Sequence, residues 1–276
     1  MNIFEILFYQ PIYNIIVVFY HLLGDNLGLA IIAIGIVSRF VLAPVTFRQA
    51  KLAESSKEFS EKSKEIKKKY KDNKVKQQEE LLALQREYLP AQLGGCLPLI
   101  FQLIVFINVY SVIRNLISSG AEGFNNIAYS FVPKLSSEVS GDFLGIMDLK
   151  LSPGEVSGSD IYPYLLLVLL VGITQFFSTK LLTSLRNKAQ KEEEKPKKNK
   201  KKNEDPTDDF AEIMQRSTKQ VGYILPFFLM LVSYQLPAGL SIYLITTSLF
   251  VILQQVVYFY YKERKKKLSQ NPDVKN

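Results

Sequence analysis

The residue that could do chemistry most directly is an arginine inside an apolar run. Arg39, preceded by Ser38, interrupts the largely apolar stretch from Leu27 to Phe47, which is long enough to cross a bilayer. Its guanidinium is permanently charged and presents hydrogen-bond donors only. Arg39 can therefore bind or attract an acidic or polar group, and the question is which group it meets.

Cysteine and histidine, two residues that often carry covalent or metal chemistry, occur once each. The one cysteine, Cys96, excludes an internal disulfide and a cysteine-based zinc site. The one histidine, His21, excludes an HExxH motif and a Ser-His pair inside the membrane. The sequence also lacks a glycine-rich phosphate loop. We expect no catalytic residue, no metal and no cofactor, and we predict that the protein is not an enzyme.

The elements that position Arg39 are predicted to be membrane-spanning helices. Of the 276 residues 47% are hydrophobic, and they are segregated from the charged residues into blocks, as is typical of a polytopic membrane protein. The last apolar block, 221–261, is too long for one span and contains LPAG at 236–239, where the chain can turn. The sequence thus predicts an all-α polytopic protein with five spans, at about 27–47, 93–113, 161–182, 221–236 and 239–261.

The first 24 residues are apolar but contain scattered polar side chains. These include Glu5, Gln10, Asn14 and His21, and the segment has neither the basic start nor the cleavage site of a secretory signal. We interpret 1–24 as an amphipathic segment lying in the membrane interface. A sixth span is the alternative.

The distribution of positive charge predicts the topology. Residues 48–92, 180–219 and the tail from Lys262 onward contain 30 of the 34 lysines and arginines. Basic residues close to span ends mark the cytoplasmic side. We therefore expect the C-terminus in the cytoplasm and the N-terminus and the segment 114–160 outside. The lack of a transit peptide and the lysine-rich inside loops favour a bacterial inner membrane over an organelle.

Two of the basic segments differ in composition. In 48–89, rich in helix-forming residues, Leu52, Phe59 and Ile66 fall seven apart, which predicts an antiparallel helical hairpin with a narrow apolar seam. A solvated charged linker is the alternative. The loop 183–218 contains the run KPKKNKKKN and is predicted to be flexible. The tail 263–276 is short and basic.

No acidic partner for Arg39 exists in the predicted spans, none of which contains Asp or Glu. Arg39 lies about 18 Å from the outer end of its span. One interpretation is that it snorkels to the cytoplasmic interface. The other is a hydrated cavity open to the cytoplasm, with polar residues of other spans on its wall. Each of those polar residues could instead make an interhelical hydrogen bond. The candidates are Gln102, Asn108, Gln175 and Gln254.

Four segments of the sequence resemble the YidC family of membrane protein insertases, which has relatives in mitochondria and chloroplasts. They are SRFVLAPVT (38–46), LGGCLPLIFQ (93–102), YPYLLLVLLVGITQFF (162–177) and LPAGLSIYLITTSLFVILQQ (236–255). The resemblance implies five helices around a hydrophilic groove, with Arg39 as the groove arginine. It also implies that Tyr243 contacts the incoming chain. Gly35, one turn before Arg39, departs from members that have a hydroxyl residue there.

The resemblance implies insertion of nascent membrane proteins without ATP or covalent catalysis, alone or with the Sec translocase. The other expected partners are membrane lipids and, through the basic loop and tail, the ribosome; DNA is not expected. A channel or secondary transporter is the alternative, although the sequence shows no inverted repeat and no carboxylate in a span. A further alternative is a chaperone that assists the folding of membrane proteins without inserting them.

Overall fold

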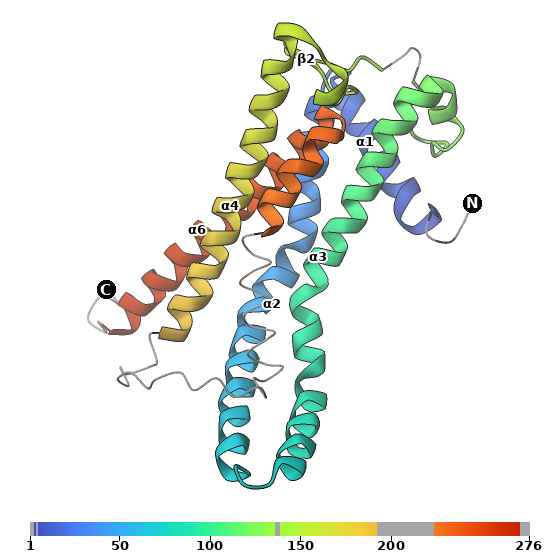
Figure 1. Cartoon of the computed structure of the whole chain (residues 1–276). Helices are drawn as coiled ribbons and strands as arrows, with labels where there is room; N and C mark the ends of the chain where they lie inside the picture. The colour runs from blue at the N-terminus through green and yellow to red at the C-terminus, as the bar shows by residue number, and fades with distance from the viewer. Residues whose placement is uncertain (1–2, 4, 136–138, 192–223, 271–276) are drawn as a thin grey trace. The chain divides into compact units, whose positions relative to one another are not determined.

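The computed structural model describes residues 3, 5–135, 139–191 and 224–270, and the described chain is mostly helical (Figure 1). The chain divides into two compact units. The first contains 1–39, 104–185 and 219–276, and the second contains 40–103 and 186–218. The helices are η1 (Glu5–Tyr9), α1 (Gln10–Leu22), α2 (Leu27–Lys69), α3 (Lys74–Asn125), α4 (Ile161–Lys191), a helix at Ile224–Gln235 and α6 (Ala238–Gln270).

Three helical stretches among the described residues are long and apolar enough to cross a membrane. They are Leu27–Pro44, Gly158–Leu181 and Ala238–Tyr258. Two shorter apolar helical stretches among the described residues, Ile100–Asn115 and Ile224–Gln235, overlap the other two predicted spans, 93–113 and 221–236. The structure therefore supports an all-α membrane protein by length and composition. Three of the five predicted spans coincide with candidate spans among the described residues, and the count of five remains a prediction.

The two longest helices continue through the predicted boundaries between span and hairpin. α2 runs past residue 47 with Pro44 inside it, and α3 runs without a break from Lys74 to Asn125. The chain breaks between them at 70–73, where Asn73 caps α3 by accepting a hydrogen bond from the backbone N–H of Lys76. The chain also turns at Leu236 and Pro237, within the LPAG segment.

A small β-hairpin, which the sequence analysis did not predict, interrupts the helical pattern. Strands β1 (Asp142–Phe143) and β2 (Met147–Asp148) pair antiparallel. The turn between them places Leu144 and Gly145 at positive φ, 60° and 68°. Two successive residues of this kind form the tight turns that hairpins favour. We refer to residues 139–160, which include this hairpin, as the cap.

The cap is bonded to the start of two helices of the first unit. Near the start of α6, the backbone N–H groups of Ala238 and Gly239 donate to the carbonyls of Leu151 and Leu149, at 2.8 and 3.0 Å. The first amides of a helix have no partner within the helix, so the cap satisfies two of them. At the start of α4, the hydroxyl of Tyr164 bonds the backbone of Asp148. Figure 1 shows the cap beside the ends where these helices begin.

The core of the first unit depends on close approach at two glycines. A Cβ at Gly28, near the start of α2, would lie 2.2 Å from the ring of Phe143 in the cap. A Cβ at Gly239 would lie 2.9 Å from Ile31 and 3.0 Å from Ile113. Small residues of this kind allow helices to pack closely in a membrane, where apolar burial alone does not drive association.

The second unit contains a compact apolar seam. Phe59 of α2 packs with Leu84 and Tyr88 of α3, and Ile66 lies against this cluster. The Nζ of Lys62 donates to the Tyr88 hydroxyl at 2.9 Å. This bond raises the pKa of Lys62, with smaller contributions from Glu58 and Glu87.

Parts of several predicted segments lie outside the described residues. These are most of the basic loop 183–218, the first three residues of the span 221–236, and the end of the tail 263–276. The described helices α4 and α6 extend into the loop and the tail, to Lys191 and Gln270.

Candidate functional site

Arg39 lies half-buried on α2 in the first unit. Among the residues that the structure describes, its Nε is buried and has no hydrogen-bond partner. The adjacent Ser38 does not supply one, since its hydroxyl donates to the carbonyl of Gly35 at 2.8 Å in the same helix. A buried guanidinium donor that the described protein does not satisfy is suited to meeting water, lipid phosphate or a ligand.

Tyr243 on α6 is an aromatic neighbour of the Arg39 guanidinium. Its side chain is fully buried and interacts electrostatically with Arg39. Its ring packs against that of Phe106 on α3, with ring centroids 6.3 Å apart. The structure thus brings two residues singled out by sequence together and adds Phe106. Phe106 was missed because one phenylalanine in an apolar run carries no distinguishing signal.

Gly35 marks a close contact between α2 and α6. A Cβ at this position would lie 3.2 Å from the methyl carbon of Thr246 and 3.6 Å from that of Thr247. The space that a hydroxyl side chain at position 35 would need is therefore largely occupied by these two threonine methyls. The glycine at position 35, in place of a hydroxyl residue, thus allows α2 and α6 to pack tightly one turn from Arg39.

Several buried polar side chains of the first unit bond their own helix. Asn108 donates to the carbonyl of Ile104 at 2.6 Å, Thr174 to Leu170 at 2.7 Å and Thr247 to Tyr243 at 3.0 Å. Bonds of this type satisfy a polar group without a second helix. These contacts explain how polar residues are accommodated here, and they distinguish Asn108 from Arg39.

The remaining candidates are distributed over both units. Gln175 on α4 and Gln254 on α6 are half-buried in the first unit. Gln102 is half-buried on α3 and belongs to the second unit. An electrostatic interaction joins Arg39 and Tyr243, and a wall formed by the glutamines remains a prediction.

Comparison with known proteins decides the family. The profile of the family described as "60Kd inner membrane protein" matches residues 18–266, which include both Arg39 and Tyr243. The chain belongs to this YidC insertase family. The match also covers α2, α3, α4 and α6 almost completely.

Two relatives of this YidC-family chain have the same name. "Membrane protein insertase YidC" of Fusobacterium nucleatum is 26% identical over 229 residues, covering 83% of this chain and 84% of the relative. The protein of that name from Endomicrobium trichonymphae is 26% identical over 239 residues, covering 87% of this chain and 37% of the relative. The chain therefore spans most of one relative and little more than a third of the other.

Proposed function

We propose that this protein inserts nascent membrane proteins into a bacterial inner membrane and assists their folding. The observation that carries the proposal is Arg39, a charged side chain on a candidate span whose buried Nε has no partner among the described residues. Family membership over residues 18–266 supports the same function. Insertion of this kind needs no ATP and no covalent catalysis.

The proposed site is a hydrated groove formed by five spans and open to the cytoplasm. An arginine in the middle of a span costs about 2.5–3.5 kcal/mol on insertion scales. Water in the groove would lower that cost and would also receive the short polar end of a substrate. Gln102, Asn108, Gln175, Tyr243 and Gln254 are proposed to contribute to the wall, with Tyr243 contacting the incoming chain.

The driving force is the transfer of the apolar substrate helix into lipid. Burial of apolar surface contributes about 25 cal/mol per Å², so a complete transmembrane helix can offset the movement of a short polar tail. A long or highly charged tail would exceed this gain. We propose that such substrates require cooperation with the Sec translocase.

The proposed topology agrees with the arrangement of the cap. Residues 139–160 bond the starts of α4 and α6, and Phe143 packs against the start of α2. The segment 114–160 contains only three basic residues, so we assign this end to the outside and the C-terminus to the cytoplasm.

The amino-terminal segment is proposed to lie in the membrane interface. One face of α1 is buried, with Tyr13, Ile16 and Val17 in the core of the first unit. The other face exposes Ile15, Val18 and Leu22. An exposed apolar face on a helix attached to a membrane protein is suited to contact with lipid.

The cytoplasmic partners are assigned by charge. The hairpin 48–89 is proposed to receive the nascent chain, and the basic loop 183–218 and tail 263–276 to attract ribosomal RNA or anionic lipid. The channel or transporter alternative is not favoured, because none of the predicted spans contains a carboxylate to carry a proton or a cation.

Insertion by the purified protein tests the proposal. A small single-span substrate is presented to liposomes containing only this protein, and its protection from protease is measured. We expect protection with wild type, reduced protection with Arg39→Glu, and an intermediate value with Arg39→Ala. Equal protection by all three proteins would show that hydration matters more than charge. Equal protection by empty liposomes would overturn the insertase proposal.

A further inference from the structure

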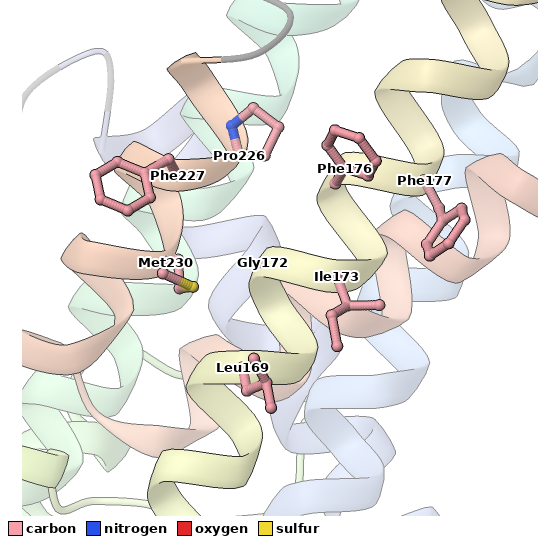
Figure 2. Close-up of a pocket in the computed structure, with 8 residues that line it drawn as sticks. All are labelled: Leu169, Gly172, Ile173, Phe176, Phe177, Pro226, Phe227 and Met230. Carbon is pink, nitrogen blue, oxygen red and sulfur yellow. The ribbon is translucent and has the colours of Figure 1, made fainter.

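A cavity of about 330 Å³ lies between α4 and the helix at Ile224–Gln235, both in the first unit (Figure 2). Its size is at the lower end of the range for small-molecule sites. All of its lining residues are apolar, so it is suited to a hydrocarbon ligand. They include Leu169, Ile173 and Phe176 from α4, and Pro226, Phe227 and Met230 from the neighbouring helix.

The cavity opens where the two helices diverge from a close contact. At Gly172 a Cβ would lie 2.7 Å from the Sδ of Met230, so the helices approach closely at this level. The aromatic side chains beyond it are only partly covered by the described protein, and Phe177 is 56% exposed. Because α4 is long and apolar enough to cross a membrane, these exposed rings face lipid in the cell.

A lysine lies at the rim of the cavity. Lys180, one turn after Phe176, places its Nζ 5.6 Å from the centroid of the Phe176 ring. It lies at the end of the apolar stretch Gly158–Leu181, where a span reaches the headgroup region. Lys180 is exposed, so its ammonium group is accessible to an anion at the interface.

We propose that this cavity binds one acyl chain of an anionic phospholipid whose phosphate pairs with Lys180. An apolar cavity with a cation at its rim matches an amphiphile with a negative head. This lipid site is separate from Arg39, and it relies on α4 crossing the membrane.

Photolabelling of the full chain in lipid nanodiscs tests the proposal. The probes are phosphatidylglycerol and phosphatidylcholine with a diazirine on one acyl chain, and mass spectrometry locates the label. We expect the label on the cavity-lining residues of α4 and of the neighbouring helix. The anionic probe should label them about fivefold more than the zwitterionic one, as expected for one lysine near an anionic headgroup.

Matched variants separate the two parts of the site. Ile173→Trp fills the cavity and should remove most of this label. Leu166→Trp makes the same change two turns earlier on α4, at a side chain that is also exposed but does not line the cavity, and should leave the label unchanged. Lys180→Gln should abolish the preference for the anionic probe, whereas Lys180→Arg should retain it.

Three results would overturn the lipid site. The first is labelling of the cavity no stronger than labelling around Leu166. The second is undiminished labelling in Ile173→Trp. The third is a benzoylphenylalanine at Phe177 that crosslinks to a peptide, of this chain or of a substrate, instead of to lipid. Insertion activity in the liposome assay is scored separately, so failure of the lipid site leaves the insertase proposal standing.

Discussion

The hydroxyl of Tyr164 bonds both backbone groups of Asp148: it accepts from the N–H at 2.8 Å and donates to the carbonyl at 3.1 Å. Tyr164 is buried near the start of α4, and Asp148 is the last residue of the β-hairpin in the cap. One side chain thus holds the end of the strand to the helix that follows the cap.

Tyr164→Phe should therefore loosen the cap without emptying the space that the ring fills. Loss of a hydroxyl that serves two backbone groups should cost about 1–3 kcal/mol. Hydrogen exchange of the amides at 139–151 measures the effect, and we expect faster exchange there than in the helices. Tyr162→Phe, on an exposed residue of the same helix, is the control. Equal exchange in the two variants would show that the bonds to Asp148 do not hold the cap.

Acid should loosen the turn around Glu155 in the same cap. The backbone N–H of Ser152 donates to this carboxylate at 2.7 Å and the Ser152 hydroxyl at 2.8 Å, and these bonds lower the pKa of Glu155. Because the pKa is lowered, the carboxylate stabilises the turn fully above the ordinary glutamate pKa of about 4.3. This stabilisation is lost as the pH falls through the lowered pKa of Glu155.

The measurement is hydrogen exchange of the amides near Ser152, corrected for the intrinsic rate, between about pH 6 and pH 3. Wild type should lose protection at the acidic end, whereas Glu155→Gln should show protection that does not change with pH and lies below the wild-type value at about pH 6, because an amide oxygen accepts weaker bonds than a carboxylate. Asp160→Asn, in the following 3-10 turn, should behave as wild type. A wild-type profile that does not change with pH would contradict the assigned role of the carboxylate.

A side chain at position 35 should separate α2 from α6. In Gly35→Val the new Cβ would lie 3.2 Å from the Thr246 methyl, and the two further carbons must displace it. Overpacking of this kind typically costs about 1–3 kcal/mol. Thr246→Ser removes that methyl and should restore part of the loss in the double variant. The free energy of unfolding in detergent measures the effect. If the losses of the two single variants simply added in the double variant, the contact between Gly35 and Thr246 would be refuted.

The seam of the hairpin should depend on one of two nearby leucines. Leu84 is 6% exposed and packs with Phe59 and Tyr88, whereas Leu82 is 53% exposed. Leu84→Ala should cost about 2–5 kcal/mol, and Leu82→Ala much less. Limited proteolysis of the full chain should cut within 58–88 faster in the first variant only. Similar cutting in both variants would mean that the seam does not stabilise the hairpin.

Features with a strong one-dimensional signal were predictable from the sequence. The apolar runs at 27–47 and 161–182 contain or nearly coincide with two of the candidate spans, and the chain turns within LPAG as expected. The apolar seam also contains Phe59 and Ile66, two of the three residues on which the heptad spacing was based. Apolar length, proline and heptad spacing are local properties, so they can be read without a fold.

Features that depend on distant partners were not predictable. The β-hairpin requires Leu144 at positive φ and fits because Gly28 leaves room for Phe143. The polar residues of the spans looked alike in sequence, but the side chain of Asn108 bonds its own helix whereas Arg39 lies beside Tyr243. Rotation of each helix about its axis distinguishes them, and neighbouring helices determine that rotation.

The bonds between the cap and α6 have a consequence for how the protein itself is made. The carbonyls of Leu149 and Leu151 meet the amides of Gly239 and Ala238, so the cap cannot be completed until α6 has been synthesised. At about 5–20 residues per second, roughly ninety residues of translation take on the order of 4–20 s. During that interval the growing chain contains Arg39 but lacks Tyr243. Its own biogenesis therefore passes through an incomplete form in which Arg39 is already present and α6 is not. In that form, groups other than α6 must surround the arginine.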